Sequence, residues 1–422
     1  MLINIRFPKA HTLIMILSAL LLLCAAVSCG NSEKDTPRDV SSADIVNSSE
    51  QPVDVSLSDT SMELGFGITR SIIATGGNKI EWKSSDSSIA AVENDGSVRG
   101  VDLGECVITA RNEFGRSAEC RVTVKKTCYL SIDDGPLSSA GFILDALKET
   151  DAKATFFLVD SIYFPIVKRM ADEGHALALH TRFNRTSRCY SNQYIYYTDL
   201  EIMNDHLEEI TGQRSNILRF PGGSNNETAD HLTMRRIVNG AHDLGYRVFD
   251  WTMSAGDASS KGTYELSCKM IYTYCTKNQE IILMHDKNFT PNVIRTMVPI
   301  LRKRGYVFET LDHYPDYSYE FVCAYSRDNP DIPAESVVLN PPELEIPTGS
   351  EFTLEAVMTP EESTDFVVWE SSDDSVAKTD MGGTITGIAV GEAVITAKTT
   401  SGKTATCKIK VIPKQETSSG EK

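Results

Sequence analysis

The chain has 422 residues, of which 41% are hydrophobic, so it is too long for one ordinary domain and has enough apolar material for two or three packed cores. Its formal net charge is -17 at pH 7, and such an excess of carboxylates argues against a basic patch for nucleic acid or for an anionic membrane surface. We therefore expect no nucleic-acid partner.

The first 29 residues are typical of an export signal rather than of a folded domain. A basic stretch precedes an apolar run from Leu13 to Val27, which is shorter than the ~20 residues of a comfortable membrane span. The run leads into Ala26-Val-Ser-Cys29, which resembles the lipobox of bacterial lipoproteins, although leucine is commoner than alanine at the first position. The resemblance implies that Cys29 is lipidated and anchors an extracytoplasmic protein to the bacterial cell membrane. An ordinary cleaved signal with a chance cysteine is the alternative.

Two segments of the chain are copies of one module. Trp82-Lys-Ser-Ser-Asp corresponds to Trp369-Glu-Ser-Ser-Asp, and Cys120 corresponds to Cys407, at one constant offset (369 − 82 = 407 − 120 = 287). Each copy alternates apolar and polar residues in short runs between Gly, Ser and Asp turns, which predicts a small all-β sandwich. The pattern resembles the bacterial immunoglobulin-like group 2 domain. The resemblance implies a spacer or adhesion module with a self-contained core that includes the tryptophan; a tryptophan that stacks on sugar is the alternative.

Between the two copies the sequence changes to alternating strands and helices. Buried-strand candidates such as 129–132, 154–159 and 281–284 alternate with amphipathic helical stretches such as 141–149 and 293–303. This alternation predicts a parallel sheet, either open or closed into a barrel. In such folds the reactive groups gather on the loops at the carboxyl ends of the strands.

Polar clusters follow these strands where the strands end. A lone histidine at such a position is usually structural, but five clusters in one domain predict a catalytic site at this edge of the sheet. The clusters are Asp133-Asp134-Gly-Pro, His180-Thr181, Arg219-Phe-Pro-Gly-Gly, Asp257 and His285-Asp286.

The same clusters lie in the segments S-I-D-D-G-P, L-H-T-R-F-N, R-F-P-G-G, S-A-G-D and L-M-H-D. In this order they are similar to the five motifs of the NodB-homology polysaccharide deacetylases, over about residues 127–312. The resemblance implies an α/β protein, with a distorted (β/α) barrel flanked by the two immunoglobulin-like sandwiches. It also implies a hydrolase of carbon–nitrogen bonds other than peptide bonds, which removes N-acetyl groups from a polysaccharide.

Substrate, partners and organisation follow as expectations. A lipoprotein at the cell surface meets peptidoglycan, so N-acetylglucosamine or N-acetylmuramic acid of the wall is the first choice, with exopolysaccharide, chitin-type oligomers and acetylated xylan as alternatives. We expect a monomer. In chain order we expect a signal peptide at 1–29, a flexible tether at 30–50, a module at 51–126, the deacetylase domain at 127–312, a linker at 313–334, a module at 335–412 and a tail at 413–422.

The resemblance also assigns catalytic roles. Asp133 is the general base, and Arg219 pairs with it and keeps its carboxylate ionised and oriented. His285 is the general acid for the leaving amine, and Asp257 raises its pKa. The backbone N–H of Gly222 stabilises the tetrahedral oxyanion. The acetyl and sugar pocket is lined by Leu283, Trp251 and Pro221, with core packing as the alternative for Trp251.

The metal site departs from the family pattern. The resemblance makes Asp134 and His180 ligands of a divalent ion, zinc first, with cobalt or nickel as alternatives. The family places a second histidine four residues after the first, but this chain has Asn184 there, whose amide oxygen is a weaker ligand. We expect His180 and Asn184 to share one face of a short helical turn. Three interpretations remain open: an active enzyme with looser metal binding, a catalytically impaired pseudoenzyme that binds glycan, and a plain surface adhesin.

Overall fold

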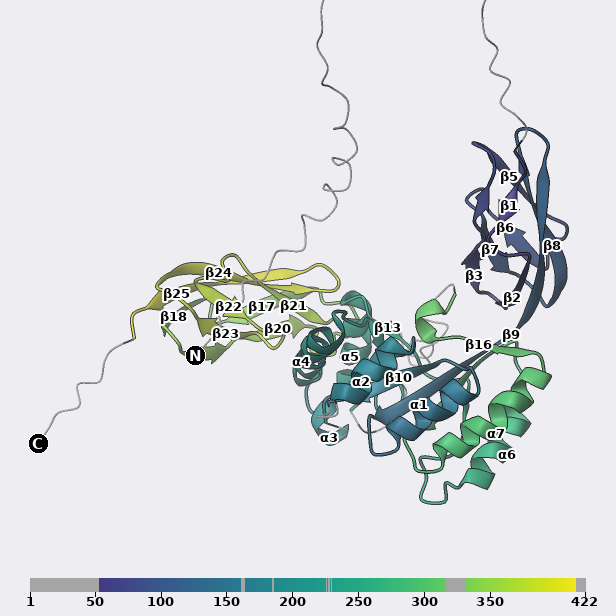
Figure 1. Ribbon diagram of the computed structural model, residues 1–422. Coiled ribbons are helices and arrows are strands. Elements are labelled where there is room, and N and C mark those ends of the chain that lie inside the picture. The colour runs from purple at the N-terminus through teal and green to yellow at the C-terminus, as the bar shows by residue number, and fades with distance from the viewer. Residues whose placement is uncertain are drawn as a thin grey trace, which may run out of the picture. The chain divides into compact units, whose positions relative to one another are not determined.

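The computed structural model of the chain describes both modules and the segment between them (Figure 1). Cys29, Asn184, the tether at 30–50 and most of the linker lie outside the described residues. Within the described part, no helix is long and apolar enough to cross a membrane. The described ranges are 53–160, 164–183, 186–224, 226, 228, 230–315 and 331–414.

The segment between the modules is built on a parallel sheet with the strand order β13-β12-β11-β10-β9-β15-β14. Only residues 249–252 separate the two edge strands β13 and β14 in the sequence, so the sheet curves until its edges approach each other. This arrangement is the distorted (β/α) barrel that the sequence predicts. The strands are β9 (Ser117–Gly135), β10 (Ala154–Val159), β11 (Ala176–Thr181), β12 (Ile217–Leu218), β13 (Arg247–Val248), β14 (Met253–Ser254), β15 (Gln279–His285) and β16 (Tyr306–Phe308), the last of which also pairs with β9.

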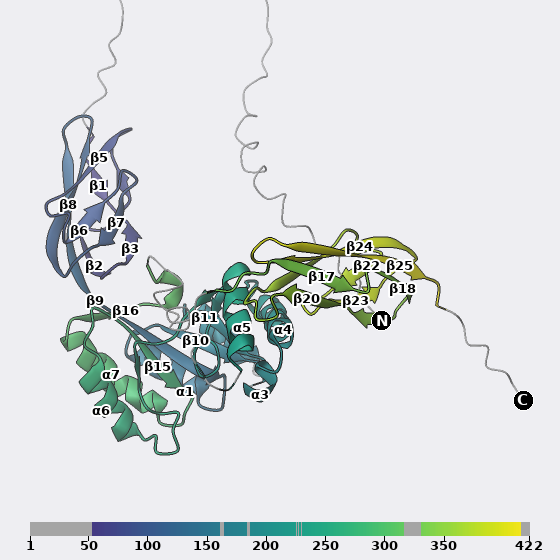
Figure 2. The ribbon, with the colours of Figure 1, turned by 180° about the vertical axis from the view of Figure 1, so that it is seen from behind.

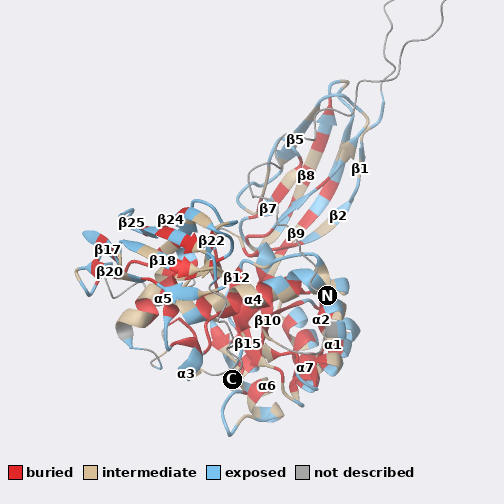
Figure 3. Cartoon of the chain, turned by 90° about the vertical axis from the view of Figure 1, so that its left-hand side faces the viewer, coloured by how far each residue is buried: buried red, intermediate tan, exposed pale blue. Residues whose placement is uncertain are grey.

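Helices connect the strands and cover the outside of the curved sheet (Figures 1 and 2). Their apolar residues are buried against it, while their polar faces are exposed, as the burial colours of Figure 3 show. The helices are α1 (Ala140–Glu149), α2 (Phe164–Asp172), α3 (Thr186–Cys189), α4 (Gln193–Thr211), α5 (His231–Asp243), α6 (Tyr264–Tyr274) and α7 (Thr290–Lys303), with a short η1 (Leu311–His313) near the end.

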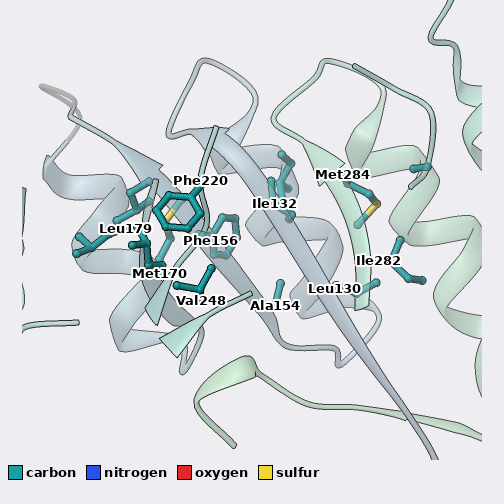
Figure 4. Close-up of a cluster of buried hydrophobic side chains, with 14 of the residues drawn as sticks. Leu130, Ile132, Ala154, Phe156, Met170, Leu179, Phe220, Val248, Ile282 and Met284 are labelled. Atoms are coloured by element: carbon teal, nitrogen blue, oxygen red, sulfur yellow. The ribbon is translucent and has the colours of Figure 1, made fainter. Parts of the chain in front are cut away.

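Strand alternation decides which side chains face the inside of the barrel. In β9, Leu130 and Ile132 point toward the helices and belong to the main hydrophobic core (Figure 4). The residues that alternate with them, Ser131 and Asp133, therefore face the barrel interior. The other strands follow the same rule, since β15 places Ile282 in the main core. The barrel interior is thus where the polar strand-end residues meet.

The first module is continuous with the barrel. β9 crosses the position of the predicted boundary at 126/127 without a break: Arg121 pairs with a module strand, and Asp133 pairs with barrel strands. Leu64 of the module and Phe249 of the barrel belong to one hydrophobic core. The expectation of a self-contained module core is therefore wrong here. The module strands are β1 (Ser56–Leu57), β2 (Ser61–Gly65), β3 (Thr69–Ser71), β4 (Ala74–Thr75), β5 (Ile80–Ser84), β6 (Ala90–Val92), β7 (Ser97–Gly100) and β8 (Gly104–Asn112).

The second module repeats the first strand for strand. β21 begins at the repeat offset from β5 (367 − 80 = 287), and so does β24 from β8 (391 − 104 = 287). Trp369 is buried, and a Cβ on Gly383 would lie 2.5 Å from its ring, so the indole packs directly against the glycine backbone. The expected core tryptophan is confirmed. The strands are β17 (Ser336–Asn340), β18 (Glu343–Pro347), β19 (Glu351–Thr353), β20 (Glu355–Thr359), β21 (Val367–Ser371), β22 (Ala377–Thr379), β23 (Thr384–Gly387), β24 (Gly391–Thr399) and β25 (Thr404–Ile412).

The second module contacts the barrel through the loop before β21. Phe366 is only 1% exposed and belongs to the main core of the barrel, with its ring 5.1 Å from that of Tyr197 in α4. Backbone carbonyls of the loop accept hydrogen bonds from α5, to Ser363 from Arg236 at 3.0 Å and to Thr364 from Asn239 at 2.8 Å. The loop thus completes the core over α4 and α5.

This contact predicts a change in barrel stability from a substitution in the module. Phe366→Ala should lower the free energy of unfolding by about 3–5 kcal/mol, because it opens a cavity in the barrel core. Hydrogen exchange of the amides in α4 and α5, followed by mass spectrometry, measures this. Phe352→Ala is the control, since Phe352 is 37% exposed on the same module. Unchanged protection of α4 and α5 in Phe366→Ala would mean that the loop is not part of the barrel core.

Candidate active site

The polar strand-end residues converge inside the barrel, as strand alternation requires. Asp133 lies two residues before the end of β9 and is directly paired with His285 at the end of β15. His180 lies in β11, and Arg219 follows β12 directly. The structure therefore brings together the residues that the sequence assigns to catalysis.

Arg219 is the centre of this cluster, and its side chain is 0% exposed. The guanidinium donates to the Asp133 carboxylate at 2.8 Å, to the Ser131 hydroxyl at 2.8 Å, and to the carbonyls of Phe249 at 2.8 Å and Asp250 at 3.0 Å. A buried cation is tolerated only when its charge and its N–H groups are satisfied in this way. Arg219 therefore holds the Asp133 carboxylate in one orientation, as predicted.

The tautomer of His180 is set by its neighbour. Its Nδ1 lies 2.8 Å from the backbone carbonyl of Arg219, which only accepts hydrogen bonds, so Nδ1 carries the proton. The lone pair of Nε2 then faces Oδ1 of Asp134 at 3.5 Å and Oδ2 of Asp133 at 3.9 Å. The lone pairs of these three atoms, one imidazole nitrogen and two carboxylate oxygens, repel one another unless a cation or a proton lies between them. This donor set fits a positively charged ion.

Asp133 and Asp134 are adjacent, yet both carboxylates approach the same imidazole. In a regular strand neighbouring side chains point to opposite faces, and the backbone explains why these two do not. Asp134 has φ of 69°, and the pairing with β10 skips it, since Phe157 pairs with Asp133 and Leu158 with Gly135. Such a bulge turns the extra residue toward the face of its neighbour. The bulge thus brings the second carboxylate to the site.

His285 is held by Asp257 from two directions. Oδ1 of Asp257 lies 2.9 Å from Nδ1 of His285, and Oδ2 accepts the backbone N–H of the same histidine at 2.7 Å. Burial alone would lower the pKa of His285, but the hydrogen bond and charge of Asp257, together with the charges of Asp133 and Asp134, outweigh it and raise the pKa above 6.5. This shift favours the imidazolium form, in the direction that the general-acid assignment requires.

The loop after Arg219 is fixed by residues that sequence reasoning missed. Tyr190 donates to the Pro221 carbonyl at 2.7 Å, and Asp250 accepts the Ser224 backbone N–H at 2.9 Å. Gly222 is exposed at the tip of this fixed loop. The position of Asp250, directly after a buried strand, was a signal that could have been found; nothing in the sequence points to Tyr190.

The remaining site residues are placed as follows. Leu283 is buried in β15 beside Ser131, and Trp251 is half-buried with its ring 5.7 Å from the Arg219 guanidinium. His206, the next histidine after His180 in the sequence, lies in α4, and its Nδ1 pairs with Asp160 at 3.2 Å.

The metal-ligand set is incomplete among the described residues. His180 lies in a strand and α3 begins only at Thr186, so the expected helical turn that starts at His180 is wrong. No group of three His, Cys, Asp or Glu side chains that could hold a metal occurs in the described ranges. Two ligands of one tetrahedral zinc ion are about 3.4 Å apart, close to the 3.5 Å between His180 and Asp134. This pair therefore fits a metal, with further ligands to come from elsewhere.

Comparison with known proteins identifies the class. The family model described as polysaccharide deacetylase matches residues 121–249, and that of the bacterial Ig-like domain (group 2) matches 68–122 and 333–409. A peptidoglycan-N-acetylglucosamine deacetylase of Bacillus cereus is 32% identical over 219 residues, which are 48% of this chain and 77% of that protein. A putative polysaccharide deacetylase of Bacillus subtilis is 31% identical, over 44% of this chain and 67% of the relative.

The catalytic domain of a peptidoglycan N-acetylglucosamine deacetylase from Eubacterium rectale is 31% identical, with a TM-score of 0.43, and the match covers 44% of this chain and 89% of that one. From the sequence relatives, the chain belongs to the polysaccharide deacetylase family. The expected class, a hydrolase of carbon–nitrogen bonds other than peptide bonds, is confirmed.

The His285–Asp257 pair predicts a shift in the titration of the histidine. Asp257→Asn removes a negative charge but not the burial, so the pKa of His285 should fall, and less imidazolium should be present at neutral pH. NMR titration of the carbon-bound protons of the His285 imidazole measures this pKa. Asp312→Asn, at an exposed position, should leave the titration of His285 as it is. An unchanged His285 titration in Asp257→Asn would contradict the assignment of Asp257 as the group that raises the pKa of His285.

Proposed function

We propose that the protein is a metal-dependent deacetylase that hydrolyses N-acetyl groups of a cell-surface polysaccharide, with N-acetylglucosamine of peptidoglycan as the first-choice substrate. The observation that carries this proposal is the buried Arg219–Asp133 pair, placed beside His180 and paired across the sheet with His285. The names of relatives support the substrate, since one from Bacillus cereus is a peptidoglycan-N-acetylglucosamine deacetylase and one from Bacillus subtilis, 27% identical, is a peptidoglycan-N-acetylmuramic acid deacetylase.

Asp133 is the general base in this proposal. An amide carbon is a poor electrophile and water is a poor nucleophile, so a base must remove a proton from water as it attacks. One oxygen of Asp133 is occupied by Arg219 at 2.8 Å, and the other faces His180 at 3.9 Å. The second oxygen is thus oriented toward the ion site, where the water would be deprotonated.

His285 is the general acid. The amine leaves only when its nitrogen gains a proton, and an imidazolium beside the base supplies it. The carboxylate of Asp257 keeps Nδ1 protonated, so the proton that moves is the one on Nε2. The acid and the base stand on adjacent strands, at directly paired positions.

Asp134 and His180 would hold the divalent ion, with Asn184 as the further ligand that the sequence suggests. When bound, such an ion supplies polarisation of the acetyl carbonyl and activation of water. Zinc suits the imidazole and carboxylate donors, and cobalt and nickel are alternatives.

The backbone N–H of Gly222 is the candidate donor to the oxyanion, and Leu283, Trp251 and Pro221 are the candidate walls of the substrate pocket. The fixed loop supports this assignment, because a donor must be held in place before charge develops on the substrate. A lipid anchor at Cys29 would place the site outside the cell membrane, at the wall.

A glycan-binding pseudoenzyme or surface adhesin is the alternative function, and the observation that favours it is the position of the family's second histidine, where this chain has Asn184. The intact acid–base set favours the enzyme, because binding alone has no use for a base held by a buried arginine.

The enzyme and the binding protein differ in acetate release. With added divalent metal, the purified protein should release acetate from N-acetylated glycan, and Asp133→Asn and His285→Ala should each lower kcat by ~10²-fold or more. Asp172→Asn and His313→Ala, at exposed positions, are the matched controls and should remain near wild type. Near-normal rates in either site variant would overturn the assigned roles, and no release by the wild type would favour the pseudoenzyme.

A further inference from the structure

A hollow lies where the second module meets the amino ends of α4 and α5. It has two lobes, of about 550 Å³ and about 310 Å³, which share Asn192, Tyr194, Thr353 and Gly382. Volumes of this size are typical of small-ligand sites. None of the residues assigned to catalysis or metal binding lines either lobe.

The hollow is connected to the candidate active site through α3. Helices of a (β/α) fold begin at the edge of the sheet where the active site lies, so the amino ends of α4 and α5 are on that side. Cys189 at the end of α3 hydrogen bonds with Thr181 at 2.7 Å, next to His180. Tyr190 reaches the Pro221 carbonyl. The α3 and α4 residues that line the hollow therefore lie only a few positions after His180 in the sequence.

An unsatisfied polar atom marks the larger lobe. Gln193 lines it and is 7% exposed, and its Oε1 has no hydrogen-bond partner in the described part of the chain. Leaving such an acceptor buried and unpaired is unfavourable, and native proteins rarely tolerate it without a reason. A ligand that donates a hydrogen bond in this lobe would supply the missing partner.

The lining favours a ligand that donates hydrogen bonds and carries no negative charge, because its cations are engaged and it contains carboxylates. Arg236 is engaged by the carbonyls of Ser363 at 3.0 Å and Glu361 at 2.9 Å, and Arg188 pairs with Asp199 at 3.3 Å. Besides these groups, the lobes present the carboxylates of Glu355, Glu361 and Asp380, amides, hydroxyls, the ring of Tyr194 and several apolar side chains. Sugar hydroxyls and acetamido N–H groups are donors of the kind that an amide oxygen accepts.

We propose that this hollow binds uncharged, N-acetylated sugar residues of the same polysaccharide strand, several units away from the residue that is deacetylated. The proposal rests on the proposed function for the identity of the strand. It gives the second module a role in substrate recognition, because one wall of the hollow belongs to β19 and β20.

Length-dependent binding tests the proposal. Calorimetry with the full chain, in the presence of a chelator to prevent turnover, compares N-acetylglucosamine oligomers of two and six units. Gln193→Leu should weaken binding of the hexamer by about threefold to tenfold, the effect of one lost hydrogen bond, and so reduce the preference for the longer ligand. Gln213→Leu, an identical change at the exposed carboxyl end of α4, is the control and should bind as the wild type does.

A second variant fills the hollow from the module side. Thr353 is exposed on β19, so Thr353→Trp should fold normally and weaken binding of the hexamer by steric exclusion. Hexamer affinity equal to wild type in both Gln193→Leu and Thr353→Trp would overturn the proposal, even if acetate is released. Hexamer binding that depends on both residues, without any acetate release, would support the hollow and refute the deacetylase function instead.

Discussion

A single buried cation organises the catalytic side of the barrel. Arg219 has no contact with solvent, so each of its N–H groups must find an acceptor in the protein, and these come from β9 and from the chain after β13. Its own backbone carbonyl sets the tautomer of His180. The base, the imidazole and the ends of two strands are therefore coupled through one residue. Without it, Asp133 would be a buried carboxylate with no compensating charge beside it.

The sequence predicted much of this site because strand ends and strand alternation are local properties. The polar residues after each apolar run predicted a catalytic site at the carboxyl edge of the sheet. The order of the motifs predicted which residues meet at that edge. The bulge at Asp134 could not be predicted from the sequence, because a single residue with positive φ does not change the alternation of apolar and polar residues. Tyr190 was missed because its role depends on a loop from a distant segment, whereas the position of Asp250 after a buried strand could have been recognised.

The prediction that each module has its own separate core was the other one that the structure contradicts. A constant repeat offset showed two copies of one module, and the natural inference was two separate cores. β9 instead runs from the first module into the barrel, and Phe366 of the second module fills the barrel core. The Phe366 contact is long-range in sequence, so no local pattern predicts it. Both modules therefore contribute residues to cores that they share with the barrel. Under the proposal for the hollow beside α4, the second module also contacts the substrate.

The central claim is that Arg219 and Asp133 depend on each other, and a double-mutant cycle of unfolding free energies tests it most directly. Asp133→Ala and Arg219→Met, each alone, leave an uncompensated buried charge and should each cost about 3–5 kcal/mol. Because the double variant removes both charges, it should cost clearly less than the sum of the two, with a coupling energy of about 2 kcal/mol or more. Additive losses, with the double variant as unstable as the two single changes combined, would contradict the account.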